Sequence, residues 1–321
     1  MKNKRFVNVH TLLLLVFVIM VIGVIYRFLN WGQKVDPNEI ISENLENTPD
    51  VNDLILPLMD KEGNIITDRD GTMTIVCFGN APFADDRESP DNLANMIAQK
   101  TGAKVYNCSI GKSYLAAENY SLQTSVVPID AYNFYWLLQL AAGAPIYERC
   151  EKANAHLGED ADPYSQEVYD TLSTLDFSEV DVITVMYDAS DYLVGHEMYN
   201  SENPTDIEQF TGNLEAGIEL IQENFPWIRI IVMSPTYAFA VDDDGNYVSS
   251  DQYTYGWDVL STYAIKQQSS CFNRSVTFID HLYGTINEDN AKEYLIDNLH
   301  LNKAGRELVA DRFVEALYYY D

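Results

Sequence analysis

The sequence is short of cysteine, histidine and basic residues. It has four cysteines and five histidines among 321 residues, and no Cys/His spacing resembles a zinc site. Only 20 lysines and arginines stand against 49 aspartates and glutamates. Because such an acidic surface repels nucleic acid and anionic polymers, we expect no nucleic-acid partner. No internal repeat or low-complexity tract is present, and nothing in the sequence calls for a metal or another cofactor.

The four cysteines do not define a disulfide framework. Cys77 and Cys108 lie in apolar segments that we expect to form neighbouring core strands, where a free thiol behaves as a small hydrophobe. Cys150 and Cys271 are candidates for a disulfide bond outside the cell, but their positions in the sequence do not decide the matter.

One long apolar run is present, at the N-terminus. It covers residues 12–26, is preceded by basic residues and is closed by Arg27. The run is shorter than the roughly 20 residues of an upright membrane helix, but its neighbours extend it to 11–29. A cleaved signal peptide is the rival interpretation, yet no small-x-small cleavage site follows the run. We therefore predict a transmembrane signal anchor at 11–29 with residues 1–10 as a cytoplasmic tail, since a basic flank stays inside the cell.

The rest of the chain is then expected outside the plasma membrane, held by a single span. Residues 30–70 are polar and rich in turn signals, which indicates a stalk and a small hairpin. Residues 71–321 form the extracytoplasmic domain. After residue 30 the chain has 16 basic and 49 acidic residues, a formal charge of −33, which is typical of a solubilising surface.

From residue 72 onward, short apolar segments alternate with amphipathic ones. We expect strands at 72–78, 104–108, 181–186, 227–233 and 275–279, and helices near 93–100, 164–175, 206–223, 255–268 and 302–318. This alternation predicts a three-layer α/β sandwich with a central parallel sheet of the flavodoxin type. Asn302 has the position of an N-cap for the last helix, whose core face we assign to Ala304, Leu308, Phe313 and Leu317.

Two connections stand out in this pattern. Residues 114–178 form a long insertion between the second and third strands, either a lid or binding wall over the sheet or extra helices on its periphery. Residues 242–246 are acidic and contain glycine, but they lack the spacing of a calcium loop, so we expect a hairpin turn there.

Polar residues follow the strands, at the sheet edge where parallel α/β proteins bind their ligands. Gly79-Asn80-Ala81 follows the first strand, and Gly111 follows the second. The third strand is followed by Asp188, Ser190 and Asp191, and Asp297 and His300 directly precede the last helix. In order and spacing, these four blocks resemble the SGNH/GDSL hydrolase superfamily over about residues 72–318.

The resemblance implies roles for these residues. The last block of the family is Asp-x-x-His, so Asp297 would be the orienting acid and His300 the general base. The first block is Gly-Asp-Ser with the serine as nucleophile. Here Asn80 replaces the aspartate and Ala81 replaces the serine, and no serine lies within seven residues of position 81.

The oxyanion or ligand-binding positions match unevenly. The second block of the family supplies a glycine, which is Gly111 here, or Lys112 in a shifted register. The third block is Gly-x-Asn-Asp. Asp188 replaces its glycine, Ser190 replaces its asparagine, and Asp191 is retained. A serine in place of the asparagine would shorten an oxyanion donor, at a cost of about 2.7–4 kcal/mol if the donor no longer reaches.

Because an alanine methyl group cannot attack a carbonyl, the sequence predicts a degenerate active site. We expect a membrane-anchored, extracytoplasmic protein that binds a cell-envelope glycan or an acylated ligand without ordinary serine-ester hydrolysis. The alternative is an active esterase or O-acyltransferase on envelope polymers, using His300 with water or with a relocated nucleophile among Ser109, Ser113 and Ser190. The sequence gives no indication of the oligomeric state.

Other interpretations of these residues remain open at this point. Asp297 could cap a turn, and His300 could be a core histidine with satisfied hydrogen bonds. The aspartates after the strands could also gather around a divalent cation, since carboxylate oxygens are its preferred ligands; they are Asp85, Asp86, Asp188, Asp191 and Asp297.

Overall fold

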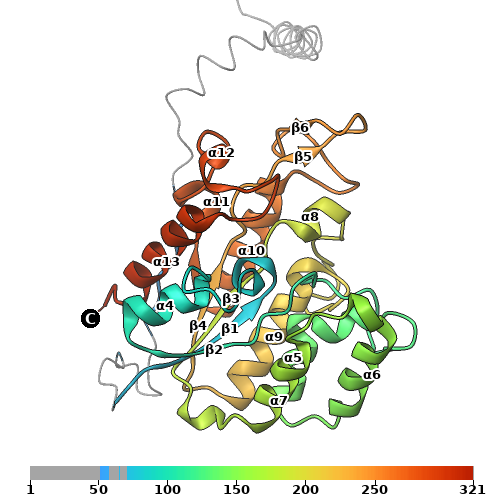
Figure 1. The fold of residues 1–321 in the computed structure, drawn as a ribbon, viewed down its shortest axis with the longest axis vertical. Helices are drawn as coiled ribbons and strands as arrows, with labels where there is room; N and C mark the ends of the chain where they lie inside the picture. Colours follow the sequence, from blue (N-terminus) through green and yellow to red (C-terminus); the bar gives the residue numbers. More distant parts are fainter. Residues whose placement is uncertain (1–50, 58–64, 66–70, 321) are drawn as a thin grey trace, which may run out of the picture. The chain divides into compact units, whose positions relative to one another are not determined.

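The computed structural model describes residues 51–57, 65 and 71–320 (Figure 1). The predicted cytoplasmic tail and signal anchor, and most of the predicted stalk, lie outside the described residues. In the described part of the chain, no helix is long and apolar enough to cross a membrane.

A five-stranded parallel sheet forms the centre of the domain, in the order β2-β1-β3-β4-β7. Its strands are β1 (Thr74–Gly79), β2 (Lys104–Asn107), β3 (Val182–Met186), β4 (Arg229–Met233) and β7 (Thr277–Ile279). Strands β1, β3, β4 and β7 are buried along their whole length, as their continuous apolar sequences require when helices cover both faces. All five predicted strands are confirmed.

The strand order places a topological switch point between β1 and β3. The chain moves outward from β1 to β2 and then returns to the other side of β1, where β3 pairs with it from Ile75 to Gly79. In open parallel sheets, the crevice at such a switch point is where ligands bind. The order β2-β1-β3-β4-β7 is that of the flavodoxin type and agrees with the predicted fold class.

Helices cover the two faces of the sheet (Figure 1). On one side, α4 (Leu93–Thr101) packs against α13 (Lys303–Leu317), and on the other, α9 (Phe210–Asn224) packs against α10 (Leu260–Arg274). Short helices follow the strands at the carboxyl edge: α3 (Ala81–Ala84), α8 (Ser190–Val194), α11 (His281–Gly284) and α12 (Ala291–Tyr294). The hairpin expected at 242–246 joins β5 (Ala240–Val241) to β6 (Tyr247–Val248) and is confirmed.

The connection between β2 and β3 folds into helices. It contains the 3₁₀ helices η1 (Pro128–Tyr132), η2 (Gly158–Asp160) and η3 (Phe177–Glu179), and the helices α5 (Phe134–Ala141), α6 (Tyr147–Leu157) and α7 (Ser165–Thr174). Helix α5 packs against both α9 and α7, and its apolar side chains belong to the main core. These helices therefore extend one helical layer of the sandwich.

The last helix is capped as predicted, but its buried face differs. Asn302 Oδ1 accepts a hydrogen bond from Gly305 N at 3.0 Å, so Asn302 is the N-cap. Ala304 is exposed, and Gly305 takes the inward position. A Cβ atom at Gly305 would lie 2.6 Å from the Tyr294 carbonyl oxygen, so only glycine lets the helix start this close to the preceding segment. The assignment of Ala304 to the core was wrong for that reason.

All four cysteines are free and buried. The possible Cys150–Cys271 disulfide is therefore absent from the structure. Cys77 and Cys108 lie in neighbouring segments as expected, since Cys108 N donates to the Cys77 carbonyl oxygen at 2.8 Å.

Candidate active site

The site is built at the carboxyl ends of β1 and β3. Gly79 ends β1 with φ +154°, and a Cβ atom there would lie 1.9 Å from the Met186 carbonyl oxygen. The close approach of the two strands therefore requires glycine at this position. Asn80 follows directly, and Ala81 is the first residue of α3, with its side chain 8% exposed.

Asn80 and Asp188 form a reciprocal pair that ties the two strand ends together. Asn80 Nδ2 donates to Asp188 Oδ1 at 2.8 Å, and Asp188 N donates to Asn80 Oδ1 at 2.9 Å. Asn80 Nδ2 also donates to the Ser113 carbonyl oxygen at 3.0 Å. Both side chains are buried, at 1% and 5% exposed. The amide at position 80 thus gives a buried carboxylate a donor that an aspartate would lack.

Asp188 is a buried carboxylate with several partners. Its Oδ1 also accepts a hydrogen bond from Ser190 N at 2.9 Å. Burial raises the pKa of Asp188, while the hydrogen bonds from Ser190 and Asn80 and the positive charge of His300 partly oppose that rise.

His300 and Asp297 form the predicted acid–imidazole pair. His300 Nδ1 lies 2.7 Å from Asp297 Oδ2, and both side chains are 40% exposed. The Leu299 and His300 N–H groups each donate to Asp297 Oδ1 at 2.8 Å. Asp297 therefore caps the turn and also holds the imidazole. The interpretation of His300 as a buried core histidine does not hold, because its side chain is open to solvent.

The turn that carries the pair is fixed on both sides. Leu295 and Leu301 form an isolated antiparallel bridge around it. The Asn298 carbonyl oxygen accepts a hydrogen bond from Phe239 N at 2.8 Å, and Asn298 Nδ2 donates to the Phe239 carbonyl oxygen at 3.1 Å. The pair thus stands on a rigid turn beside the segment that follows β4.

Carboxylates surround the imidazole and change its titration. Burial lowers the pKa of His300, but the hydrogen bond and charge of Asp297, with the charges of Asp85 and Asp188, outweigh it, so the net pKa is raised. Burial raises the pKa of Asp85, and the charge of His300 opposes that rise. His300, Asp85 and Asp188 are therefore close enough to act on each other's charge, although they come from three different segments.

The predicted oxyanion residues are only partly brought together. Asn80 and Ser190 both contact Asp188 at the strand ends. The Gly111 N–H instead donates to Asp162 Oδ2 at 2.8 Å, so this donor already has an acceptor from the insertion.

Asp191 belongs to a separate cluster. Its buried carboxylate accepts hydrogen bonds from Leu115 N at 2.9 Å and Ala116 N at 3.0 Å, and it lies 2.8 Å from His196 Nδ1. It therefore anchors the loop that follows β2. Tyr114 is near both the Asp191 cluster and Asp188. Its ring contacts His196 edge to face. Burial raises the pKa of Tyr114, and the charges of Asp191 and Asp188 raise it further. No motif in the sequence singles out Tyr114.

Two of the three serines considered as relocated nucleophiles are sealed in the interior. Ser109 and Ser113 are 0% exposed. Ser109 Oγ donates to Asn107 Oδ1 at 2.6 Å, and Ser113 Oγ donates to the Ile110 carbonyl oxygen at 2.7 Å. Ser190 is half-buried at the start of α8 and is the member of the three with accessible surface.

The interpretation of the aspartates as a cation site is not supported. Within the described residues, no three aspartate, glutamate, histidine or cysteine side chains gather closely enough to hold a metal ion. Asp86 instead pairs with Arg306 at 2.7 Å, and Asp191 is engaged as described above. Asp86 and Asp191 therefore already have partners of their own.

The strand order defines a parallel α/β domain in which a His–Asp pair lies just ahead of the last helix. A protein from Lactobacillus plantarum has a similar structure, with a TM-score of 0.52 and 16% identity, over 79% of this chain and 100% of that chain. The five-stranded parallel sheet flanked by helices fits the predicted α/β, SGNH-hydrolase-like fold, whereas the predicted transmembrane helix lies outside the described residues.

Other solved structures match at lower similarity. A carbohydrate acetylesterase from Sinorhizobium meliloti is 11% identical, over 78% of this chain and 100% of that chain, with a TM-score of 0.47. A protein from Slackia heliotrinireducens described as an SGNH hydrolase is 13% identical, over 77% of this chain and 100% of that chain, with a TM-score of 0.43. No protein-family model matches the sequence, and no curated protein sequence matches it. At these identities the likeness concerns the fold and not the activity.

Proposed function

We propose that this protein is a membrane-anchored, extracytoplasmic relative of the SGNH hydrolases that binds a cell-envelope glycan or acylated ligand without forming an acyl-enzyme. The observation that carries the proposal is Ala81, a methyl group at the strand end where the hydrolases have their nucleophile. Without a triad nucleophile, only the residual acceleration from binding and the oxyanion hole is expected.

The surroundings of Ala81 and His300, which we call the strand-end site, support binding in three ways. Ser109 and Ser113 are buried and hydrogen-bonded, so neither replaces the nucleophile. The Gly111 N–H is occupied by Asp162, which removes a donor that an oxyanion would need. The carboxylates that raise the pKa of His300 increase the share of imidazolium at a given pH, and the imidazolium donates a hydrogen bond to a ligand.

The charges also indicate which ligands fit. Carboxylates at Asp85, Asp188 and Asp297 surround a single imidazole, so an anionic polymer would be repelled. A sugar or acyl group offers hydroxyl donors to these carboxylates and carbonyl acceptors to His300. A neutral ligand of the envelope therefore suits the strand-end site better than a phosphate-rich one.

One observation favours a second candidate, an esterase or O-acyltransferase. The Asp297–His300 pair keeps the 2.7 Å hydrogen bond that orients a catalytic imidazole. In its neutral form His300 could take a proton from water or from the Ser190 hydroxyl. A nucleophile at Ser190 would explain why this pair is retained.

A fluorophosphonate probe tests the form of the second candidate in which a serine is the nucleophile. The purified protein should not be labelled, because the probe reacts with an activated serine. Labelling that disappears in Ser190→Ala would refute the binding proposal and establish the relocated nucleophile. Labelling that persists in Ser190→Ala and disappears in His300→Ala would point to another hydroxyl within reach of the imidazole.

The variant Ala81→Ser tests the position of the lost nucleophile. We expect it to be labelled by the probe, and Ala81→Ser/His300→Ala to be unlabelled, because only the first has both nucleophile and base. The matched control Ala84→Ser adds a serine to the same short helix, three residues further on, and should stay unlabelled. Equal labelling of the two single variants would refute the assignment of position 81.

A further inference from the structure

A hollow in the surface is lined by neither Ala81 nor His300, and we propose that it binds the pyranose rings of a neutral glycan. It has a volume of about 560 Å³ and is lined by Tyr199 and Trp257, with the polar residues Glu197, Asn200 and Asp258. This inference does not depend on the function proposed for the strand-end site at Ala81 and His300. We call this site the Trp257 hollow.

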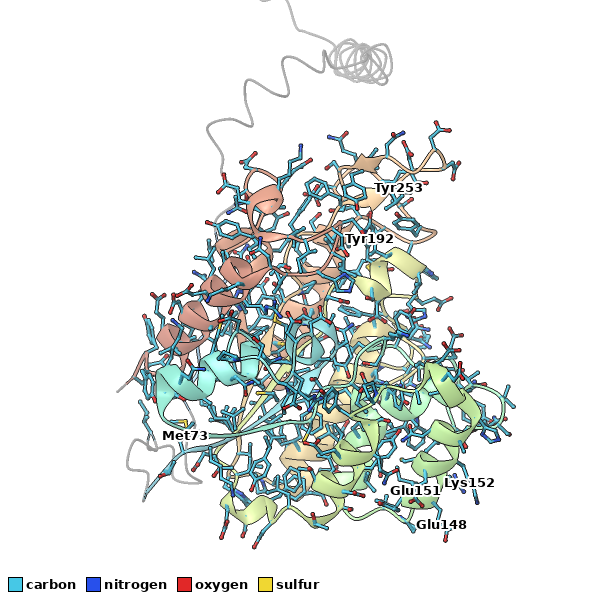
Figure 2. All side chains as sticks on the ribbon, in the orientation of Figure 1. Met73, Glu148, Glu151, Lys152, Tyr192 and Tyr253 are labelled. Atoms are coloured by element: carbon cyan, nitrogen blue, oxygen red, sulfur yellow. The ribbon has the colours of Figure 1, made fainter. Side chains whose placement is uncertain are left out.

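The Trp257 hollow is formed by two connections that leave the carboxyl ends of neighbouring strands. Residues 197–201 follow β3 and α8, and residues 257–258 follow β4 and the β5–β6 hairpin. The two connections are joined by the Tyr192 hydroxyl, which donates to the Tyr253 carbonyl oxygen at 2.8 Å. Figure 2 labels both tyrosines, and Figure 1 shows α8 beside the hairpin at this end of the molecule.

Trp257 differs from the other tryptophans that the structure describes. Among the tryptophans of the described residues, Trp136 contacts the ring of Tyr135, and Trp227 donates its indole N–H to the Phe177 carbonyl oxygen at 3.1 Å. Trp257 is 48% exposed and makes neither a ring contact nor a hydrogen bond within the described part of the chain. Tyr199, which is 46% exposed, lines the same hollow, and exposed apolar side chains that gather in one place indicate a binding site.

The opposite wall is held in place by the start of α9. The Glu197 carbonyl oxygen accepts from Phe210 N at 2.8 Å, and the Met198 carbonyl oxygen accepts from Thr211 N at 2.9 Å. The Glu197 carboxylate itself accepts from Gln209 Nε2 at 2.7 Å. The wall that carries Tyr199 is therefore preorganised, which lowers the entropy lost when a ligand binds.

The chemistry of the hollow matches a neutral sugar. A pyranose ring has an apolar face of C–H groups and an edge of hydroxyls. The open face of Trp257 can cover the first, and the carboxylates of Glu197 and Asp258 can accept from the second. Among the residues that the structure describes, Gln209 donates to one oxygen of Glu197 and Val259 N to one oxygen of Asp258, and no donor contacts the other oxygen of either carboxylate. The same carboxylates repel phosphate, sulfate and uronate groups.

A cationic ligand fits less well than a neutral one. Two aromatic rings beside two carboxylates are also a setting for a quaternary ammonium group. Lys266 Nζ, however, lies 4.1 Å from the centre of the Tyr199 ring and already fills the cation–π position there. Lys266 therefore already provides the cation that contacts Tyr199 in the Trp257 hollow.

The test is a titration of the full-length protein with neutral hexasaccharides of N-acetylglucosamine, glucose, mannose and galactose, followed by calorimetry. We expect at least one of them to bind, and Trp257→Ala to weaken that binding at least tenfold, or about 1.4 kcal/mol. The matched control Tyr319→Ala removes another exposed aromatic, 64% exposed near the C-terminus, and should leave the affinity unchanged.

Several outcomes would overturn the proposal. One is that none of the four neutral hexasaccharides binds, and another is that Trp257→Ala binds as tightly as the unaltered protein. Loss of binding in His300→Ala with Trp257→Ala unaffected would show that the glycan binds at the strand-end site. That result would support the proposed function and reject the Trp257 hollow. Binding of choline that is lost in Trp257→Ala would show that the occupant is a cation.

Discussion

Replacing Asn80 by aspartate would recreate the second residue of the Gly-Asp-Ser block, yet we expect this change to destabilise the protein. In Asn80→Asp, two buried carboxylates would face each other at the position of the present 2.8 Å hydrogen bond. The Asp188 carboxylate would lose its amide donor, and the Ser113 carbonyl oxygen would lose the donor it has at 3.0 Å.

The size of the effect follows from those contacts. Losing a hydrogen bond to a charged group costs about 1.5–3 kcal/mol, and a buried oxygen left without a donor costs about 1–3 kcal/mol. The repulsion of two like charges adds to this until one of them is protonated. We therefore expect the free energy of unfolding at pH 7.5 to fall by about 3–5 kcal/mol. With an m-value of about 3 kcal/mol/M in urea, the midpoint would fall by about 1 M or more.

The effect should depend on pH with a definite sign. Burial already raises the pKa of Asp188, and a second carboxylate would raise the folded-state pKa of the pair further above its unfolded value. A carboxyl with a raised pKa binds its proton more tightly in the folded state. Its stabilising contribution is present at low pH and is lost as the pH rises through the folded-state pKa. Asn80→Asp should therefore be less destabilised at pH 5 than at pH 7.5.

Urea unfolding followed by circular dichroism at the two pH values checks this. The matched control is the exchange Asn80→Asp/Asp188→Asn, which restores one amide and one carboxylate to the pair and should recover more than half of the loss. An Asn80→Asp protein as stable as the original at pH 7.5, or equally destabilised at both pH values, would refute the reasoning.

Two further predictions concern the strand end and the His–Asp pair. Gly79→Ala should prevent stable folding, at a cost above about 4 kcal/mol, because its Cβ would lie 1.9 Å from the Met186 carbonyl oxygen. The control Gly102→Ala, at φ +70° in open space, should cost only about 1–2 kcal/mol. Chemical denaturation measures both losses of stability, and similar losses would contradict the steric argument. Asp297→Asn should lower the pKa of His300, since Asp297 provides the leading contributions that raise it, and an NMR titration of the imidazole measures the change. His300 stabilises the fold below its unfolded-state pKa, and this contribution is lost as the pH rises through its folded-state pKa. In Asp297→Asn the contribution should be smaller. An unchanged imidazole pKa would show that Asp85 and Asp188, and not Asp297, set the pKa of His300.

The sequence predicted the fold because its signals are local. Four strands of the sheet lie in continuous apolar segments, and burial on both faces needs no more than that pattern. Asn302 was recognisable as an N-cap from its place before the last helix. The Asp297–His300 pair was also local, since three residues separate its members and one turn brings them together.

The buried face of the last helix shows where local signals fail. Ala304 was assigned to the core by helical spacing, but the 2.6 Å approach of the Tyr294 carbonyl oxygen places Gly305 there. Helical spacing defines a face only relative to a neighbour, and the position of that neighbour is set by the tertiary structure.

The sequence by itself determined that Ala81 follows the first strand and that Asp297 and His300 stand just ahead of the last helix. Only the tertiary structure decided what surrounds them. Asn80 meets Asp188 across 108 residues of sequence, and the Gly111 N–H meets Asp162 across 51 residues. Such contacts depend on the strand order and on the folding of the long insertion, which bring together side chains that no spacing along the chain relates.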